Sequence, residues 1–209
     1  MRILLVCTGT TCRSPLAERL TRALVDATLG ASAAALDVGS AGISAVAGAG
    51  MDPTAARVLG DLGGRAEGFE ARQLTARMLQ EADLVLTMTR HQREEVLGLA
   101  PRALRRTFTL REAADLVGRV DLDVLPPPAI LAERGRALPA SLDAARPARP
   151  GIDRRGDDIA DPVGRRTAVH ARVGREVHQA LLPLVQALCG SGAADHRPSS
   201  VELTERVGS

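Results

Sequence analysis

Apolar runs and helical patterns alternate along most of the chain. Residues 3–6 (Ile-Leu-Leu-Val) are apolar without interruption, which is typical of a buried parallel strand, and residues 16–24 place leucine and alanine at helical spacing. The same reading predicts strands at 35–39, 83–88 and 107–110, and helices at 53–62, 75–81, 89–97, 111–116 and about 169–188. Because such alternation favours parallel pairing, we predict an α/β fold, a doubly wound, four-stranded parallel sheet with helices on both faces.

The pattern breaks between about residues 117 and 158. Prolines recur there among scattered arginine and glycine, which predicts a long loop with one or two helical turns at 129–138. We therefore predict a single domain over residues 1–190 that contains a Pro/Arg-rich insertion at about 117–158. The polar residues 191–209 are predicted to form a disordered tail.

Composition narrows the possible environments and partners. Hydrophobic residues make up 45% of the 209 residues, Phe69 and Phe108 are the only aromatic ones, and every basic residue except histidine is arginine. A formal net charge of +2 gives no basis for binding nucleic acid or an anionic membrane. No apolar run approaches the roughly 18 residues that span a bilayer or resembles a secretory signal. The three cysteines form neither a disulfide framework nor a zinc-binding spacing. We expect a cytoplasmic monomer.

The first predicted strand leads to a candidate nucleophile. Cys7 ends the strand, a turn of small residues (8–12) follows, and Arg13 precedes a helix that Ser14 is expected to cap, with Pro15 in its first turn. Such a helix N-terminus favours a bound anion, and a thiol placed there is an effective nucleophile. The guanidinium of Arg13 can hold a phosphate by two parallel hydrogen bonds. The pattern Cys-x5-Arg thus predicts a phosphate-binding loop, although the spacing alone also fits a structural buried cysteine.

In this context the sequence resembles the low-molecular-weight protein tyrosine phosphatase family, whose N-terminal loop reads Cys-x-Gly-Asn-x-Cys-Arg-Ser-Pro. The match holds at Cys7, Gly9, Cys12, Arg13, Ser14 and Pro15. The resemblance implies the fold of that family, chemistry without a metal or other cofactor, and a phosphorylated protein as substrate. It also implies that the phosphate is bound by Thr8, Gly9, Thr10, Thr11, Cys12, Arg13 and Ser14.

Two residues outside the loop enter through the same resemblance. The family carries a Ser-Ala-Gly turn whose serine braces the loop, and Ser40 matches it, although it also fits an ordinary turn residue. The family's general acid stands in an Asp-Pro pair before the last helix, and Asp161 followed by Pro162 matches it. Asp157 and Asp158 are competing carboxylates nearby. We expect the 117–158 insertion to be mobile and to lie near the mouth of this site.

The implied mechanism uses three side chains. Cys7 attacks phosphorus while the loop amides and Arg13 hold the oxygens, and Ser14 donates a hydrogen bond to the sulfur. Asp161 protonates the leaving group and then activates the water that cleaves the cysteinyl phosphate.

The other cysteines and the histidines are given lesser roles. Cys12 is implied to be the redox partner of Cys7, forming a protective disulfide with it. Cys189, near the end of the last helix, is interpreted as structural. No ligand pairing is visible among the histidines, which we interpret as surface or boundary residues: His91, His170, His178 and His196.

Two departures from the family pattern bear on activity and substrate. Thr10 replaces the loop asparagine, although a β-branched residue tolerates left-handed backbone poorly. Val163 and Gly164 follow the Asp-Pro pair where tyrosine-directed members carry aromatic residues. Thr11 is found in the protein arginine phosphatases of the family, which this loop resembles most closely.

These features predict a phosphatase that hydrolyses phosphoarginine in proteins. A low-molecular-weight protein tyrosine phosphatase is the alternative. An inactive phosphate-loop domain that binds phosphoproteins is an alternative of another class, raised by Thr10. An arsenate reductase on the same fold would need further reactive cysteines, and none lies between Cys12 and Cys189.

Overall fold

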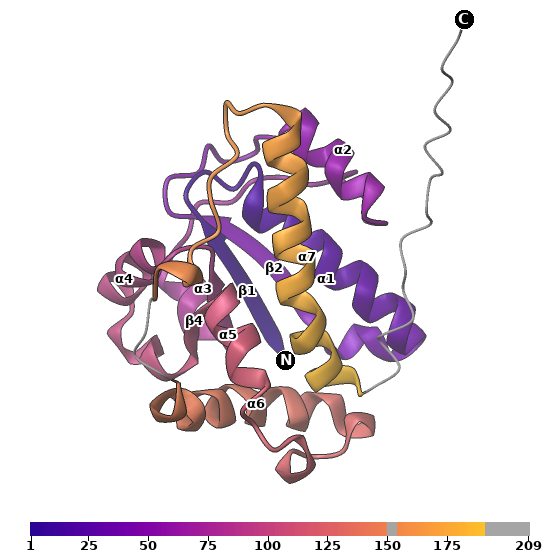
Figure 1. The fold of residues 1–209 in the computed structure, drawn as a ribbon, viewed down its shortest axis with the longest axis vertical. Helices are drawn as coiled ribbons and strands as arrows, with labels where there is room; N and C mark the ends of the chain where they lie inside the picture. Colours follow the sequence, from indigo (N-terminus) through magenta and orange to yellow (C-terminus); the bar gives the residue numbers. More distant parts are fainter. Residues whose placement is uncertain (150–153, 191–209) are drawn as a thin grey trace, which may run out of the picture.

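Four parallel strands form the sheet at the centre of the computed structural model, which describes residues 1–149 and 154–190 (Figure 1). The strand order is β2-β1-β3-β4. The strands are β1 (Arg2–Cys7), β2 (Asp37–Gly42), β3 (Leu84–Thr87) and β4 (Thr107–Thr109). The predicted four-stranded parallel sheet is therefore confirmed. In the register of β1 and β2, Cys7 lies opposite Gly42, so the segment after Cys7 leaves the sheet beside the end of β2.

Helices follow the strands along the chain. The α-helices are α1 (Arg13–Leu29), α2 (Pro53–Asp61), α3 (Ala76–Glu81), α4 (Arg90–Leu99), α5 (Leu110–Val117), α6 (Leu131–Ala145) and α7 (Thr167–Cys189). Short 3-10 helices occupy Gly30–Ala35, Pro101–Arg106, Leu122–Val124, Pro128–Ile130, Arg146–Ala148 and Arg154–Asp157. Side-chain caps fix several starts: Asp52 accepts from the N–H groups of Thr54 and Ala55, and Thr89 forms a capping box with Gln92.

Alternate residues of the strands belong to two apolar clusters. Ile3 and Leu5 of β1 belong to the larger cluster, which includes buried residues of α1, α5, α6 and α7. Leu4 and Val6 belong to a smaller cluster with residues of α3 and α4. Because side chains alternate between the faces of a strand, the two clusters occupy opposite faces of the sheet, as predicted.

The insertion differs from its predicted form and place. Instead of a loop with one or two helical turns, it contains the 15-residue helix α6, whose Leu131, Leu138 and Leu142 are buried in the larger cluster. Figure 1 shows α6 across the end of the sheet at which the N-terminus lies, and Gly135 of α6 faces the side chain of Met1. Since β1 runs away from Met1 for about 20 Å before Cys7, the expectation that this part of the insertion lies at the active-site mouth is wrong.

The tail predicted at residues 191–209 lies outside the described residues. Among the helices of residues 1–149 and 154–190, none combines the length and apolar character that crossing a bilayer requires.

Candidate active site

The loop between β1 and α1 directs its carbonyl groups outward. The carbonyls of Cys7 and Thr8 accept hydrogen bonds from Ile43 N (3.0 Å) and Ser44 N (2.9 Å), and that of Thr11 accepts from Asp52 N (2.9 Å). In a planar trans peptide the next N–H group points opposite to the carbonyl. The N–H groups of Thr8, Gly9 and Cys12 therefore point away from these neighbouring segments, toward the inside of the loop. Such an array of N–H groups at a helix N-terminus suits an anion.

Cys7 meets Ser14 inside this loop. Its Sγ lies 3.0 Å from Ser14 Oγ, and both side chains are buried. Helix α1 begins at Arg13 with Cys12 as its N-cap residue, and Cys12 makes no side-chain capping bond. The prediction that Ser14 caps the helix is therefore wrong: Ser14 lies within the first turn, and its hydroxyl faces the sulfur.

Arg13 and Asp161 are brought together from sites 148 residues apart. Arg13 is buried, its Nη1 donates to the Ile159 carbonyl (3.1 Å), and its Nη2 donates to Asp161 Oδ2 (2.6 Å). Ile159 is itself held because its N–H donates to the Met88 carbonyl at the end of β3 (2.8 Å). The Asp161 side chain is 48% exposed, so its carboxylate faces both the arginine and solvent.

The two competing carboxylates have other partners. Asp157 is buried and forms a bidentate pair with Arg149. Asp158 Oδ1 accepts from the backbone N–H of Arg90, the first residue of α4 (2.8 Å). Of the three aspartates between 157 and 161, Asp161 is the one that reaches the loop arginine.

Thr10 has the left-handed backbone that the family's asparagine would tolerate. Its φ is +52°, and it is the only residue other than glycine with positive φ in residues 1–149 and 154–190. Its hydroxyl is buried without a hydrogen-bond partner. A Cβ atom on Gly42 would lie 2.3 Å from this hydroxyl and 2.6 Å from the Thr8 carbonyl oxygen, so the loop packs closely on the end of β2. The predicted conflict between threonine and this backbone is present.

Ser40 does not donate to the phosphate loop. Its Oγ donates instead to Glu18 Oε2 on α1 (2.5 Å), and both residues are buried. A hydroxyl has a single proton, so Ser40 has none left to donate. The direct brace implied by the family is thus replaced by a contact with the helix that follows the loop.

Gln92 is a loop contact that sequence reasoning missed. Its Nε2 donates to Thr8 Oγ1 (3.0 Å), while its Oε1 accepts from the N–H groups of Met88 and Thr89 (3.0 and 3.1 Å). Gln92 therefore joins the phosphate loop to the turn between β3 and α4. The sequence signal was its place three residues after Thr89, which indicated only a helix cap.

Cys12, the N-cap residue of α1, is buried. Burial and the nearby carboxylate of Asp52 raise the pKa of its thiol to about 12. Thr11 Oγ1 lies 3.9 Å from the sulfur. Disulfide exchange needs a thiolate, and this shift disfavours the thiolate form of Cys12 at neutral pH. His170 is also buried here, contrary to its prediction as a surface or boundary residue.

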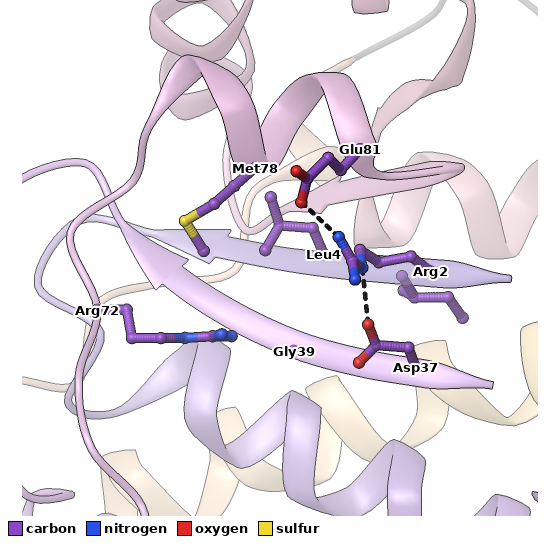
Figure 2. A pocket seen from close by; sticks show the side chains of 8 residues that line it. Arg2, Leu4, Asp37, Gly39, Arg72, Met78 and Glu81 are labelled. Atoms are coloured by element: carbon purple, nitrogen blue, oxygen red, sulfur yellow. Dashed lines mark hydrogen bonds and ion pairs between the residues drawn. The ribbon is translucent and has the colours of Figure 1, made fainter. Parts of the chain in front are cut away.

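A separate cavity opens on the face of the sheet against which α3 lies (Figure 2). It lies beside β1, β2 and α3 and is lined by Arg2, Ile3, Leu4, Asp37, Gly39, Arg72, Met78 and Glu81 (Figure 2). Arg2 bridges Asp37 (2.7 Å) and Glu81 (2.5 Å) there. Because these strand residues precede the carboxyl ends of β1 and β2, the cavity is distinct from the loop that holds Cys7.

A family model and the individual sequence relatives of this chain indicate the same protein family. A protein-family model described as low molecular weight phosphotyrosine protein phosphatase matches residues 2–138. The low molecular weight protein-tyrosine-phosphatase Wzb of Salmonella typhi is 40% identical to this chain over 100 residues, 48% of this chain and 62% of Wzb. The match thus spans less than two thirds of that relative, and Asp161 lies outside the range of the family model.

Solved structures resemble nearly the whole chain. The YwlE arginine phosphatase from Geobacillus stearothermophilus has a TM-score of 0.64 and 26% identity, covering 94% of this chain and 97% of its own. The tyrosine phosphatase AmsI of Erwinia amylovora has a TM-score of 0.61 and 25% identity, covering 90% and 92%.

Proposed function

The chain belongs to the low molecular weight phosphotyrosine protein phosphatase family, and on this basis we propose that it hydrolyses phosphorylated proteins through a cysteinyl-phosphate intermediate on Cys7. The observation that carries this proposal is the contact of Arg13, on the loop of Cys7, with Asp161. This contact supports a site in which a nucleophile, a phosphate-binding guanidinium and a carboxylic acid act together. A reducing cytoplasm suits its reactive thiol.

The contacts suggest an order of events. In the proposed reaction Cys7 attacks phosphorus, the loop N–H groups and Arg13 hold the phosphate oxygens, and no metal takes part. A phosphate oxygen that binds Arg13 Nη2 competes with Asp161, whose carboxyl group is then free to protonate the leaving group. The same carboxylate next activates water against the S–P bond, which restores the Cys7 thiolate and releases phosphate.

We propose phosphoarginine as the preferred substrate. Phe69 and Phe108, the only aromatic residues of the chain, are both buried, so neither can stack on a phenol ring in the site. Val163, beside the general-acid candidate, is 57% exposed and aliphatic. The structural similarity to the YwlE arginine phosphatase also supports phosphoarginine as the substrate, and so does the presence of Thr11 in the loop.

Phosphotyrosine is the second candidate. The names of the sequence relative Wzb and of the structural relative AmsI both describe tyrosine phosphatases. A missing stacking contact is worth on the order of 0.5–1.5 kcal/mol, which weakens binding of a phenol without forbidding it.

The activity is tested with the purified full-length chain on p-nitrophenyl phosphate and on phosphoarginine and phosphotyrosine peptides. We expect turnover that disappears in Cys7→Ser, and a higher kcat/KM for the phosphoarginine peptide. Asp161→Asn should lower kcat by about 10²- to 10⁴-fold. Peptide binding without turnover by the wild type would support the inactive binding domain instead.

The specificity is tested by Thr11→Ile. Its larger side chain should shift the ratio of kcat/KM values toward phosphotyrosine, on the order of tenfold. Thr28→Ile, at the far end of α1, is the matched control and should leave the ratio unchanged. Faster hydrolysis of phosphotyrosine by the wild type, with a ratio that Thr11→Ile does not move, would replace the arginine assignment with the tyrosine one.

A further inference from the structure

Three residues with metal-binding side chains lie close together near the N-terminal ends of α1, α2 and α7. The Sγ of Cys12, a carboxylate oxygen of Asp52 and a ring nitrogen of His170 all lie within 4.8 Å of one another. Cys12 precedes α1, Asp52 caps α2, and His170 lies in the first turns of α7. The proposed phosphatase reaction uses neither Asp52 nor His170.

The fold brings these three elements together by specific contacts. The N–H of Asp52 donates to the Thr11 carbonyl (2.9 Å), which fixes the start of α2 against the loop. One helical turn after His170, Gly174 faces α2, where an added Cβ would lie 2.4 Å from Val58 Cγ1. The missing side chain lets α7 approach α2 closely, and it places His170 on the same face, toward Asp52.

His170 points a free nitrogen into this cluster. Its side chain is 3% exposed, and its Nδ1 has no hydrogen-bond partner; the distance to Asp52 Oδ1 is 3.8 Å. A buried polar atom without a partner destabilises the folded chain, so this nitrogen favours any group that can bind to it. A metal ion between the three residues would supply that partner.

We propose that Cys12, Asp52 and His170 form a binding site for a divalent transition-metal ion of the zinc class. Thiolate, imidazole and carboxylate together suit zinc rather than magnesium or calcium, which take oxygen ligands. Tetrahedral zinc bonds of 2.0–2.3 Å need ligand atoms about 3.4–3.6 Å apart. Asp52 and His170, at 3.8 Å, are close to this separation, and no pair of ligand atoms needs to approach by more than about 1.4 Å. On binding, the Cys12 thiol releases its proton to solvent as the metal–sulfur bond forms.

The site has an entrance and room for a further ligand. Cys12 and His170 are buried, but the Asp52 side chain is 31% exposed, which gives the ion a path from solvent. Three protein ligands leave one tetrahedral position for water. If the proposed phosphatase reaction is correct, a metal on Cys12 would also prevent that thiol from forming a disulfide with Cys7.

The site is tested by metal binding in the full-length chain after treatment with a chelator. The Cys7→Ser variant is used beside the wild type, because it removes the other thiol of the loop and makes the readout independent of phosphatase activity. We expect one zinc ion per chain by titration calorimetry in both proteins. Cobalt should give a sulfur-to-metal charge-transfer band, which reports thiolate ligation directly.

Three variants in the Cys7→Ser background remove one ligand each. Cys12→Ser should abolish the charge-transfer band, and His170→Phe should weaken zinc binding by at least about 100-fold. Asp52→Asn should weaken it as well, while keeping the helix cap, since asparagine is an equally good N-cap. Cys189→Ser and His91→Phe, on residues outside the cluster, are matched controls that should bind as tightly as the Cys7→Ser parent.

Circular dichroism and thermal melting identify the variants that fold. Because each ligand variant tests the same site, zinc binding by any two folded variants of the three is enough to test the proposal. Zinc binding that survives His170→Phe and Asp52→Asn would overturn the proposal, as would loss of binding in Cys7→Ser. Absence of stoichiometric binding by the wild type would overturn it too, whatever the phosphatase assays show.

Discussion

At the scale of single residues, Thr10 carries the clearest local conflict in the site. It combines a φ of +52° with a buried hydroxyl that has no partner. Left-handed backbone at a non-glycine residue costs on the order of 1–3 kcal/mol, and asparagine tolerates it better than a β-branched residue. We predict that Thr10→Asn raises the melting temperature, by about 2–4 °C for each kcal/mol gained, and keeps or raises turnover.

Thr11→Asn is the matched control for this prediction. It changes the same residue type in the same loop, but at a position whose φ is not positive, so we expect no gain in melting temperature. Differential scanning calorimetry and steady-state kinetics on both variants make the comparison. A loss of both stability and turnover in Thr10→Asn would show that threonine fits this loop.

Residues joined by local pattern could be predicted from the sequence, whereas residues joined only by tertiary contact could not. Cys7 and Arg13 were identified because a strand, a turn and a helix follow one another within fifteen residues. Asp161 needed the family resemblance, because the Pro162 that follows it distinguishes it from the two aspartates before it only when the family's Asp-Pro pair is known. The position of Gln92 indicated a helix cap but not its contact with Thr8, which lies 84 residues away in the chain. Nothing in the sequence indicated that His170 lies near Asp52, because the two residues belong to different segments of the chain.

At the scale of elements, α6 shows how burial can override a local breaker. Pro139 lies inside this helix, although proline removes a backbone hydrogen bond there. The prolines and arginines of the segment predicted a loop, yet two of the arginines anchor it. Arg134 is buried and donates to the Ala187 carbonyl at the end of α7 (2.6 Å). Arg146 donates to the Thr107 carbonyl (2.6 Å) and lies over the Phe108 ring (4.1 Å).

The junction of β2 with the phosphate loop gives an element-scale prediction. A Cβ at Gly42 would lie 2.6 Å from the backbone oxygen of Thr8, which cannot move without moving the loop. We predict that Gly42→Ala lowers kcat/KM on the order of 10²-fold, because a displacement of about 1 Å in a catalytic group has that effect.

Gly98→Ala is the matched control for Gly42→Ala. Its added Cβ would meet nothing within 4 Å in helix α4, so it should leave kcat/KM unchanged and stabilise the chain by about 0.5–1 kcal/mol. Full activity of Gly42→Ala would contradict the close packing of the loop on β2.

At the scale of the whole molecule, the titratable groups are unusually few at alkaline pH. The chain has no tyrosine and no lysine, and its arginines stay protonated there. The thiols are therefore the side chains that titrate between about pH 9 and pH 12. Burial raises the pKa of Cys12 to about 12 and that of Cys189 to about 11, from an ordinary value of 9.0.

These shifts predict how stability depends on pH. Above the ordinary thiol pKa the unfolded chain loses protons that the folded chain keeps, so the folded state binds more protons and the free energy of unfolding falls as pH rises. Each thiol contributes a slope of up to about 1.4 kcal/mol per pH unit.

Urea unfolding between about pH 8 and pH 11, with reductant and chelator present, measures this slope. Over this range Cys12→Ser and Cys189→Ser should each flatten the slope, and the double variant should flatten it most. A double variant that keeps the wild-type slope would show that neither thiol is protected from ionisation by the fold.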